Sequence, residues 1–299
     1  MRYGKVTIST LCVGAIMLLV QQGFTVGAQF PDHPYAERYR HAAEILEGAL
    51  PNDSDNDATA SLRRLCDGLA AAVDALPAES YVADRLRSLK ERLEAEEASP
   101  VLTDATSALV LAIVRDLRFV PRAEADLPEG FPAPTPVGEV EVKAYPVYRA
   151  AVTDNGSTAF WRLFAHIKKN GVEMTAPVEM RYAPDGRRPV LMAFLYEGPT
   201  QGQTGADGAV TVRDEPASLV VSTGVRGSRT EANLEKAKVR VGEWLDKHAD
   251  RYEPVGPPRL LGYNSPFVPR DSTYWEYQIP VREKGTPQPK EGAAAPPSP

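Results

Sequence analysis

The stretch that decides the fold reads Gly171-Val172-Glu173-Met174-Thr175-Ala176-Pro177-Val178-Glu179-Met180. Its polar residues, at positions 173, 175 and 179, alternate with apolar ones, which is typical of a β-strand with one face on a core. Pro177 cannot donate a hydrogen bond to a neighbouring strand, so we expect a sheet edge or a β-bulge at this position. We expect a helix before this strand and a second strand, 188–197, after it.

Residues 138–283 are predicted to contain this unit twice. In the first copy, a strand over 139–153, bent at Pro146, precedes a helix capped by Ser157 or Thr158 and the strands 172–182 and 188–197. In the second copy, a strand over 210–225 precedes a helix capped by Thr230, and strands around 258–263 and 274–281 follow. The order strand, helix, strand, strand, present twice, predicts an α+β fold in which both copies share one distorted antiparallel β-barrel.

The rest of the chain divides into four further segments. Residues 34–120 carry apolar residues three or four positions apart in four runs, which predicts an all-α helical bundle before the barrel. Residues 121–137 contain five prolines and are predicted to be a semi-rigid, partly extended linker. Residues 284–299 are rich in Pro, Ala and Gly, and we expect a disordered tail.

Residues 1–28 read as a signal peptide. Arg2 and Lys5 precede an apolar run over 7–20, and Val26-Gly27-Ala28 offers a cleavage site after Ala28. We therefore expect an exported protein, periplasmic or extracellular, without a membrane span once the signal is removed. The alternative is an uncleaved anchor, although the apolar run is short for a span.

Composition excludes several classes of function. The formal net charge of the 299 residues is −6 and no basic run is present, so nucleic acid is not expected as a partner. Four histidines leave little material for a metal site. The mature chain would keep a single cysteine, Cys66, and so would have no internal disulfide. The oligomeric state stays open.

Three motifs within residues 138–283 resemble those of the SOUL haem-binding proteins. Met174-Thr175-Ala176-Pro177-Val178 is similar to the central motif of that family, and Tyr263-Asn264-Ser265-Pro266-Phe267 to its Tyr-Asn-Pro-Pro-aromatic segment. Trp275-Glu276-Tyr277-Gln278-Ile279-Pro280-Val281 falls on its closing strand. The resemblance covers about half of the chain. It implies the SOUL fold and non-covalent binding of haem, or of another flat apolar tetrapyrrole, in a groove between the helices and the sheet.

Three departures from the family pattern bear on haem. Ser265 replaces the first proline of the Pro-Pro pair, and Gln278 stands where a tryptophan is common. Thr273 and Tyr274 replace a pair of arginines, which removes positive charge that could meet the haem propionates. Any haem binding is therefore expected to depend mainly on apolar contact.

Candidate groove residues follow from the same positions. They are Met174, Pro177, Tyr196, Tyr263, Phe267 and Glu276. His166 and His248 are the candidate axial ligands of haem iron, although a surface histidine and a histidine at a helix C-terminus are the commoner interpretations. A Cys-x-x-Cys-His motif is absent, so covalent haem attachment is excluded.

Glu276 supports a second class of function. The SOUL fold is similar to gyrase-inhibitor-like effector modules, in which a groove glutamate binds cations or acts as a catalytic base. The alternative to a non-enzymatic binding protein is therefore a small hydrolase that uses Glu276, and the plain interpretation of this residue is a cross-strand salt bridge. A third hypothesis is a structural envelope module without a ligand.

Overall fold

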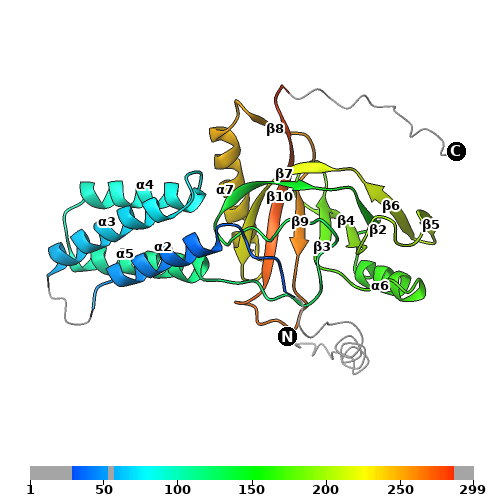
Figure 1. The fold of residues 1–299 in the computed structure, drawn as a ribbon, viewed down its shortest axis with the longest axis horizontal. Helices are drawn as coiled ribbons and strands as arrows, with labels where there is room; N and C mark the ends of the chain where they lie inside the picture. Colours follow the sequence, from blue (N-terminus) through cyan, green and yellow to red (C-terminus); the bar gives the residue numbers. More distant parts are fainter. Residues whose placement is uncertain (1–28, 53–56, 286–299) are drawn as a thin grey trace, which may run out of the picture.

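The computed structural model describes residues 29–52 and 57–285 (Figure 1). The predicted signal peptide and the predicted tail beyond residue 285 lie outside the described residues. Within the described part of the chain, none of the helices is long and apolar enough to cross a membrane.

A helical bundle occupies the region in which the apolar periodicity predicts one. Its described helices are α2 (Ala36–Ala49), α3 (Ala58–Ala75), α4 (Tyr81–Ala95) and α5 (Pro100–Leu117). The side chains of Asp57, Ser80 and Ser99 accept backbone N–H groups at the starts of α3, α4 and α5. Helix α3 packs against the other three, and buried leucines form the core between them.

The second half of the described chain is built on an antiparallel sheet of ten strands. These are β1 (Val140–Tyr145), β2 (Tyr148–Asp154), β3 (Val178–Tyr182), β4 (Pro189–Leu195), β5 (Gly205–Asp207), β6 (Val210–Glu215), β7 (Ser218–Arg226), β8 (Tyr252–Pro254), β9 (Arg259–Gly262) and β10 (Tyr274–Glu283). The strand order is β1-β7-β10-β9-β3-β4-β2-β6-β5, and β8 pairs with β10 beside this path.

The predicted antiparallel sheet is present, but it is open, so the distorted β-barrel expected from the sequence does not close. Strand β1 pairs with β7 and strand β5 with β6, and these two edges do not meet. Each edge is protected in another way. Strand β5 is three residues long, and its Asp207 is hydrogen-bonded to His166 and forms an ion pair with Lys169, both on α6 (Ala159–Lys169). Strand β1 follows Glu139, which bonds to the start of α4. Short or covered edges remove the need for closure.

The predicted repeat is present, with one correction to its first strands. The units β2-α6-β3-β4 and β7-α7-β9-β10 lie on either side of the β9–β3 pair, where α7 is Glu231–Lys247. The predicted strand 139–153 is in fact two strands, separated at Pro146, and 210–225 is likewise two, separated at Pro216. Strand β1 crosses to β7 and β6 crosses to β2, so each half supplies a strand to the other.

The decisive stretch also differs from its prediction. Strand β3 begins only at Val178, directly after Pro177, and it lies in the centre of the sheet between β9 and β4. The missing N–H of Pro177 therefore falls outside the ladder, and neither an edge nor a bulge is needed there. Thr175 and Glu179, expected on the solvent face, are buried, whereas Met180 is half-buried. The reason is that both faces of the sheet are covered.

Different elements cover the two faces of the sheet. Helices α6 and α7 pack on one face, α6 against β2, β4 and β6 and α7 against β7, β10 and β1, towards opposite ends of the sheet (Figure 1). The other face is covered by residues 121–137, which we call the strap, with Ala125, Phe131 and Val137 buried in the same cluster as Leu195. The strap is extended, as its prolines predict, but it is packed on the sheet over much of its length.

Candidate functional site

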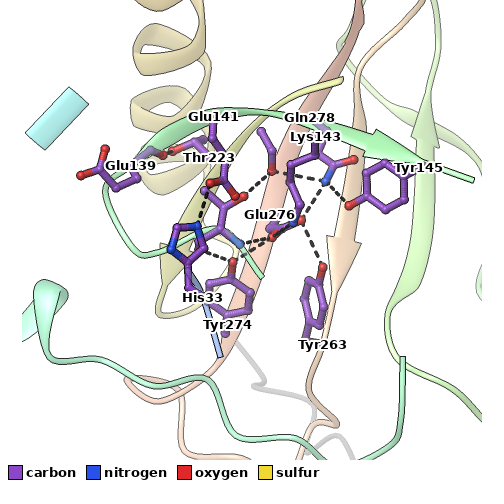
Figure 2. A network of polar contacts seen from close by, with 12 residues as sticks. His33, Glu139, Glu141, Lys143, Tyr145, Thr223, Tyr263, Tyr274, Glu276 and Gln278 are labelled. Atoms are coloured by element: carbon purple, nitrogen blue, oxygen red, sulfur yellow. Dashed lines mark hydrogen bonds and ion pairs between the residues drawn. The ribbon is translucent and has the colours of Figure 1, made fainter. Parts of the chain in front are cut away.

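A buried polar network lies on the strap side of the sheet and is centred on Glu276 of β10 (Figure 2). Glu276 Oε1 accepts hydrogen bonds from the Lys143 ammonium at 2.9 Å and from the Thr135 backbone N–H at 2.6 Å. Its Oε2 accepts from the Tyr263 hydroxyl at 3.1 Å and from Gln278 Nε2 at 2.7 Å. A carboxylate offers about four lone-pair positions, so these groups leave none for a substrate proton.

The ion pair between Glu276 and Lys143 is enclosed on all sides, with side-chain exposures of 0% and 3%. Burial opposes ionisation of Glu276, but the Lys143 ammonium and the Thr135 amide outweigh it and hold the pKa of Glu276 below its ordinary value. Burial and the neighbouring Glu276 charge raise the pKa of Tyr263 and of Tyr274 well above that of a free tyrosine. The carboxylate is therefore the charged member and both phenols stay neutral donors.

The strap takes part in this network. The Tyr274 hydroxyl lies 2.5 Å from the Thr135 carbonyl oxygen and 3.0 Å from Glu276 Oε1, so its one proton is shared between them. Gly224 of β7 lies beneath, where a Cβ would come within 2.1 Å of the Thr135 oxygen and 2.8 Å of the Pro136 oxygen. Only glycine allows the strap backbone to approach the sheet this closely.

A second cluster of charges lies on the same face, around Glu179 of β3. Glu179 accepts from Arg181 Nε at 2.9 Å and from the Tyr148 hydroxyl at 3.1 Å. Arg259 donates to Gln278 at 2.8 Å and to Tyr148 at 3.0 Å, and its guanidinium lies over the Tyr145 ring. Its Nη2 is buried without an acceptor among the described residues.

The opposite face carries a partly exposed apolar strip in the space between the two helices. Neither α6 nor α7 packs mainly on β3 or β9, and the paired residues Met180 and Met192 are half-buried there. The methionine strip, as we call it, consists of Phe160, Phe164, Met174, Val178, Met180 and Met192, all of them partly exposed.

Arg229 lies beside the methionine strip. Its Nη1 donates to Met180 Sδ at 3.4 Å and lies 3.6 Å from the position of a Cβ on Gly262. Within residues 29–52 and 57–285, no carboxylate forms an ion pair with Arg229. The residue is exposed to solvent overall, but partial burial of its guanidinium lowers its pKa below the ordinary arginine value. The strip therefore combines polarisable apolar side chains with an available cation.

The two candidate axial histidines have other roles. His166 is buried, and its Nδ1 lies 2.8 Å from Asp207 while its Nε2 lies 2.9 Å from the Tyr196 hydroxyl, so both ring nitrogens are engaged. His248 Nδ1 bonds to the Trp244 carbonyl oxygen, and the imidazole stacks on the indole with centroids 3.9 Å apart. His248 follows the C-terminus of α7, roughly 25 Å along the helix from Arg229 at its start. Both histidines thus have partners within the protein, and their role as haem ligands stays a prediction.

Comparison with known proteins assigns the family. Residues 134–272 match the family described as SOUL heme-binding protein. This part of the chain matches the SOUL family, and we call residues 134–283 the SOUL domain. Among solved structures, the C-terminal domain of EcmrR is 16% identical to this chain, with a TM-score of 0.38 over 48% of this chain and 96% of that one. A hydrolase from Listeria innocua is 12% identical, with a TM-score of 0.39 over 50% and 94%. No curated protein matches the sequence.

The predicted groove residues are divided between the two faces of the SOUL domain. Met174 belongs to the methionine strip, and Pro177 is buried just before β3. Tyr263 and Glu276 lie under the strap on the other side of the sheet. The two remaining candidates belong to neither group, because Tyr196 bonds to His166 and Phe267 is exposed on the loop before β10. The described structure therefore does not bring the six candidates together at one place, and their part in ligand binding stays a prediction.

Sequence reasoning missed Arg229 and Lys143. For Met180 and Met192 it leaves two interpretations open, the lining of a planar apolar ligand and, more commonly, plain core. An arginine directly before a helix start at Thr230 gives no signal of its own. Lys143 lies in an alternating strand, where a lysine is expected to face solvent. Across the described residues, no group of three or more His, Cys, Asp or Glu side chains is arranged to hold a metal ion.

The helical bundle docks on the SOUL domain through a buried carboxylate, Glu139. It accepts from Ser80 Oγ at 2.5 Å and from the Tyr81 backbone N–H at 2.9 Å, at the start of α4. Exposed contacts surround it, between Tyr81 and Glu243 and between Lys247 and Asp84. Burial raises the pKa of Glu139 to about 7, against the opposing effect of these hydrogen bonds.

This shift predicts a pH dependence of stability. Because the folded-state pKa lies above that of a free glutamate, the protonated form favours the folded protein. The contribution of Glu139 should be fully present below about pH 4.5 and be lost as the pH rises to about 7, by at most about 3 kcal/mol. Urea unfolding at pH 5 and pH 8, with Glu139→Gln as the non-titrating control, measures it. Equal pH dependence in both proteins would exclude this role.

Proposed function

We propose that the SOUL domain binds haem, or another flat apolar tetrapyrrole, non-covalently on the methionine strip. The observation that carries the proposal is the pairing of partly exposed apolar side chains, Met180 and Met192 among them, with the exposed, unpaired cation of Arg229. A haem molecule has the matching chemistry, since an apolar macrocycle carries two propionate carboxylates at one edge. Family membership supports the same ligand class.

The residues present fit such a group at this place. Phe160, Phe164 and Met192 would contact the macrocycle, and Arg229 would meet a propionate in place of the arginine pair that the sequence lacks. Met180 and Met192 belong to the strip, so their thioethers would hold haem iron there rather than His166 or His248. Bound haem would supply an iron centre for ligand or electron binding. The protein's own part is to hold and orient it.

The hydrolase alternative receives less support. Glu276 is fully buried, and the groups around it occupy its lone pairs. The proposal also places this domain outside the cytoplasm, on the strength of the positively charged start and apolar run of residues 1–28.

A hemin titration of the purified protein, followed by the Soret band, tests the proposal. Binding through apolar contact and one exposed cation should give micromolar affinity, with a free energy of about −8 kcal/mol at 1 μM. Met192→Glu should weaken binding at least tenfold, because it places a charge against the macrocycle. Arg229→Gln should weaken it a few-fold and remove most of its dependence on salt.

Two controls make the titration specific. Val101→Glu introduces the same charge at an exposed position of α5 and should leave hemin affinity unchanged. His248→Ala should also have little effect. If His248→Ala abolished the Soret shift while Met192→Glu did not, the binding site would lie elsewhere and the proposal would be wrong.

A further inference from the structure

We propose that the strap side of the SOUL sheet is a binding site for an extended, proline-containing peptide, which the chain's own residues 121–137 occupy in cis. This site is independent of the methionine strip, since the two lie on opposite faces of the sheet. The strap is then an exchangeable ligand tethered between the bundle and β1.

The main-chain contacts of the strap are those of a bound peptide. The Thr135 N–H donates to Glu276, and the Thr135 carbonyl oxygen accepts from the Tyr274 hydroxyl at 2.5 Å. The Thr135 hydroxyl donates to Ser222 Oγ at 2.9 Å. The sheet therefore binds Thr135 through its backbone N–H, its carbonyl oxygen and its side chain. Gly224 beneath it leaves room for the strap backbone. A separate peptide could make each of these contacts.

An aromatic anchor lies four residues earlier. Phe131 is buried and packs edge-to-face on Tyr145 and Tyr148, with ring centroids 4.9 and 5.2 Å apart. Such pairs stabilise beyond their buried area, and buried aromatic anchors dominate peptide recognition. The pattern recognised is therefore Phe-x-x-x-Thr-Pro, as it stands at residues 131–136.

The backbone of the strap suits exchange. Prolines at 128, 132, 134 and 136 favour an extended chain that needs no internal hydrogen bonds, so little conformational entropy is lost on binding. The strap is not a strand of the sheet, and its ladder contact is a single bridge from Val137 to Gly224. Its release would leave the strand order intact.

The face is also not fully satisfied by the strap. Arg259 is buried beside Tyr145 and Tyr148, the two tyrosines that hold Phe131, and its Nη2 lacks an acceptor among the described residues. A buried donor without a partner costs free energy. A peptide that adds a carboxylate or amide oxygen near the aromatic anchor would supply this acceptor. The partner chemistry is thus an aromatic residue with an acidic or amide neighbour, followed by a Thr-Pro pair.

The test uses the full chain and a fluorescein-labelled synthetic peptide of residues 127–137. The tethered strap has an effective concentration on the order of 1 mM. A free peptide at about 0.1 mM is roughly tenfold more dilute, so it should hardly displace the strap of the wild-type protein. Phe131→Ala weakens the strap and should bind the free peptide at least tenfold more tightly than the wild type does. Phe131→Leu keeps the apolar volume and should fall between them. Fluorescence anisotropy measures each affinity.

Two further arms separate specific exchange from loosened structure. A peptide with alanine in place of Phe131 should bind none of the proteins. Gly224→Ala should release the strap and yet not bind the peptide, because the added methyl group blocks any backbone at that place. Circular dichroism checks that each variant is folded. If Phe131→Ala does not fold, the peptide affinity of Phe131→Leu tests the proposal in its place. Three outcomes would overturn the proposal. The peptide could bind the wild type and the folded Phe131 variants equally, it could fail to bind the folded Phe131 variants, or it could bind Gly224→Ala.

Discussion

Replacing Lys143 by methionine should destabilise the protein by about 3–5 kcal/mol, the range found when one partner of a buried ion pair is removed. The substitution leaves the Glu276 carboxylate at 0% exposure without its cation, and the remaining donors carry no full charge. The midpoint of urea unfolding at pH 8 measures the loss. It should be smaller at pH 5, because without Lys143 burial raises the pKa of Glu276 and protonation then relieves the charge.

A double variant and a surface control identify the cause. Lys143→Met with Glu276→Gln removes both charges and should recover a large part of the stability, since a neutral amide keeps several of the hydrogen bonds. Lys90→Met breaks the exposed pair with Glu94 in α4 and should leave the unfolding midpoint nearly unchanged. If Lys143→Met were as stable as the wild type, Glu276 would not be ionised in the folded protein.

Local features of the fold could be predicted from the sequence because short-range rules decide them. Thr230 caps α7 by accepting the Asn233 N–H, as a threonine before an apolar helical run predicts. The strand predicted at 274–281 is present as β10, and polar and apolar residues alternate within it from Trp275 to Ile279. For α6 the sequence predicts a cap by Ser157 or Thr158. Thr158 occupies the N-cap position, but its side chain accepts no backbone hydrogen bond there.

Non-local features could not be predicted in the same way. Thr175 is buried because its hydroxyl donates to the Leu195 carbonyl oxygen, a partner 20 positions away. Glu276 was expected in a groove or in a cross-strand pair, but its cation lies on β1, with β7 between the two strands. The crossing of β1 and β6 between the halves decides these contacts, and alternation within one strand carries no information about it.

The candidate site shows the same division. Motifs around Met174 and Tyr263 identify the family, which the match over 134–272 shows. They do not reveal that the two residues face opposite sides of one sheet, because that depends on the register of β3 with β9 and on the strap. Prolines at 121–137 predict an extended chain. They do not predict where it packs, because that depends on Gly224 and on tyrosines in distant strands.

Replacing Gly224 by alanine should cost about 3 kcal/mol or more, because the new methyl group cannot be accommodated beside the strap. Its carbon would lie 2.1 Å from one strap carbonyl oxygen and 2.8 Å from the next, and both belong to backbone that cannot rotate away. The strap must then lift, which withdraws the Thr135 N–H from Glu276. Urea unfolding measures the loss, and faster tryptic cleavage after Arg122 reports the lifted strap.

The matched control for Gly224→Ala is Gly242→Ala in α7, where a Cβ would meet nothing within 4 Å. There the change should be neutral or stabilise by up to about 1 kcal/mol, because alanine is the better helix former. Cleavage after Arg122 should stay at the wild-type rate. If Gly224→Ala were as stable and as resistant to trypsin as the control, the strap would not rest on β7 at this point. Its contact with Glu276 would then not be what closes this face of the sheet.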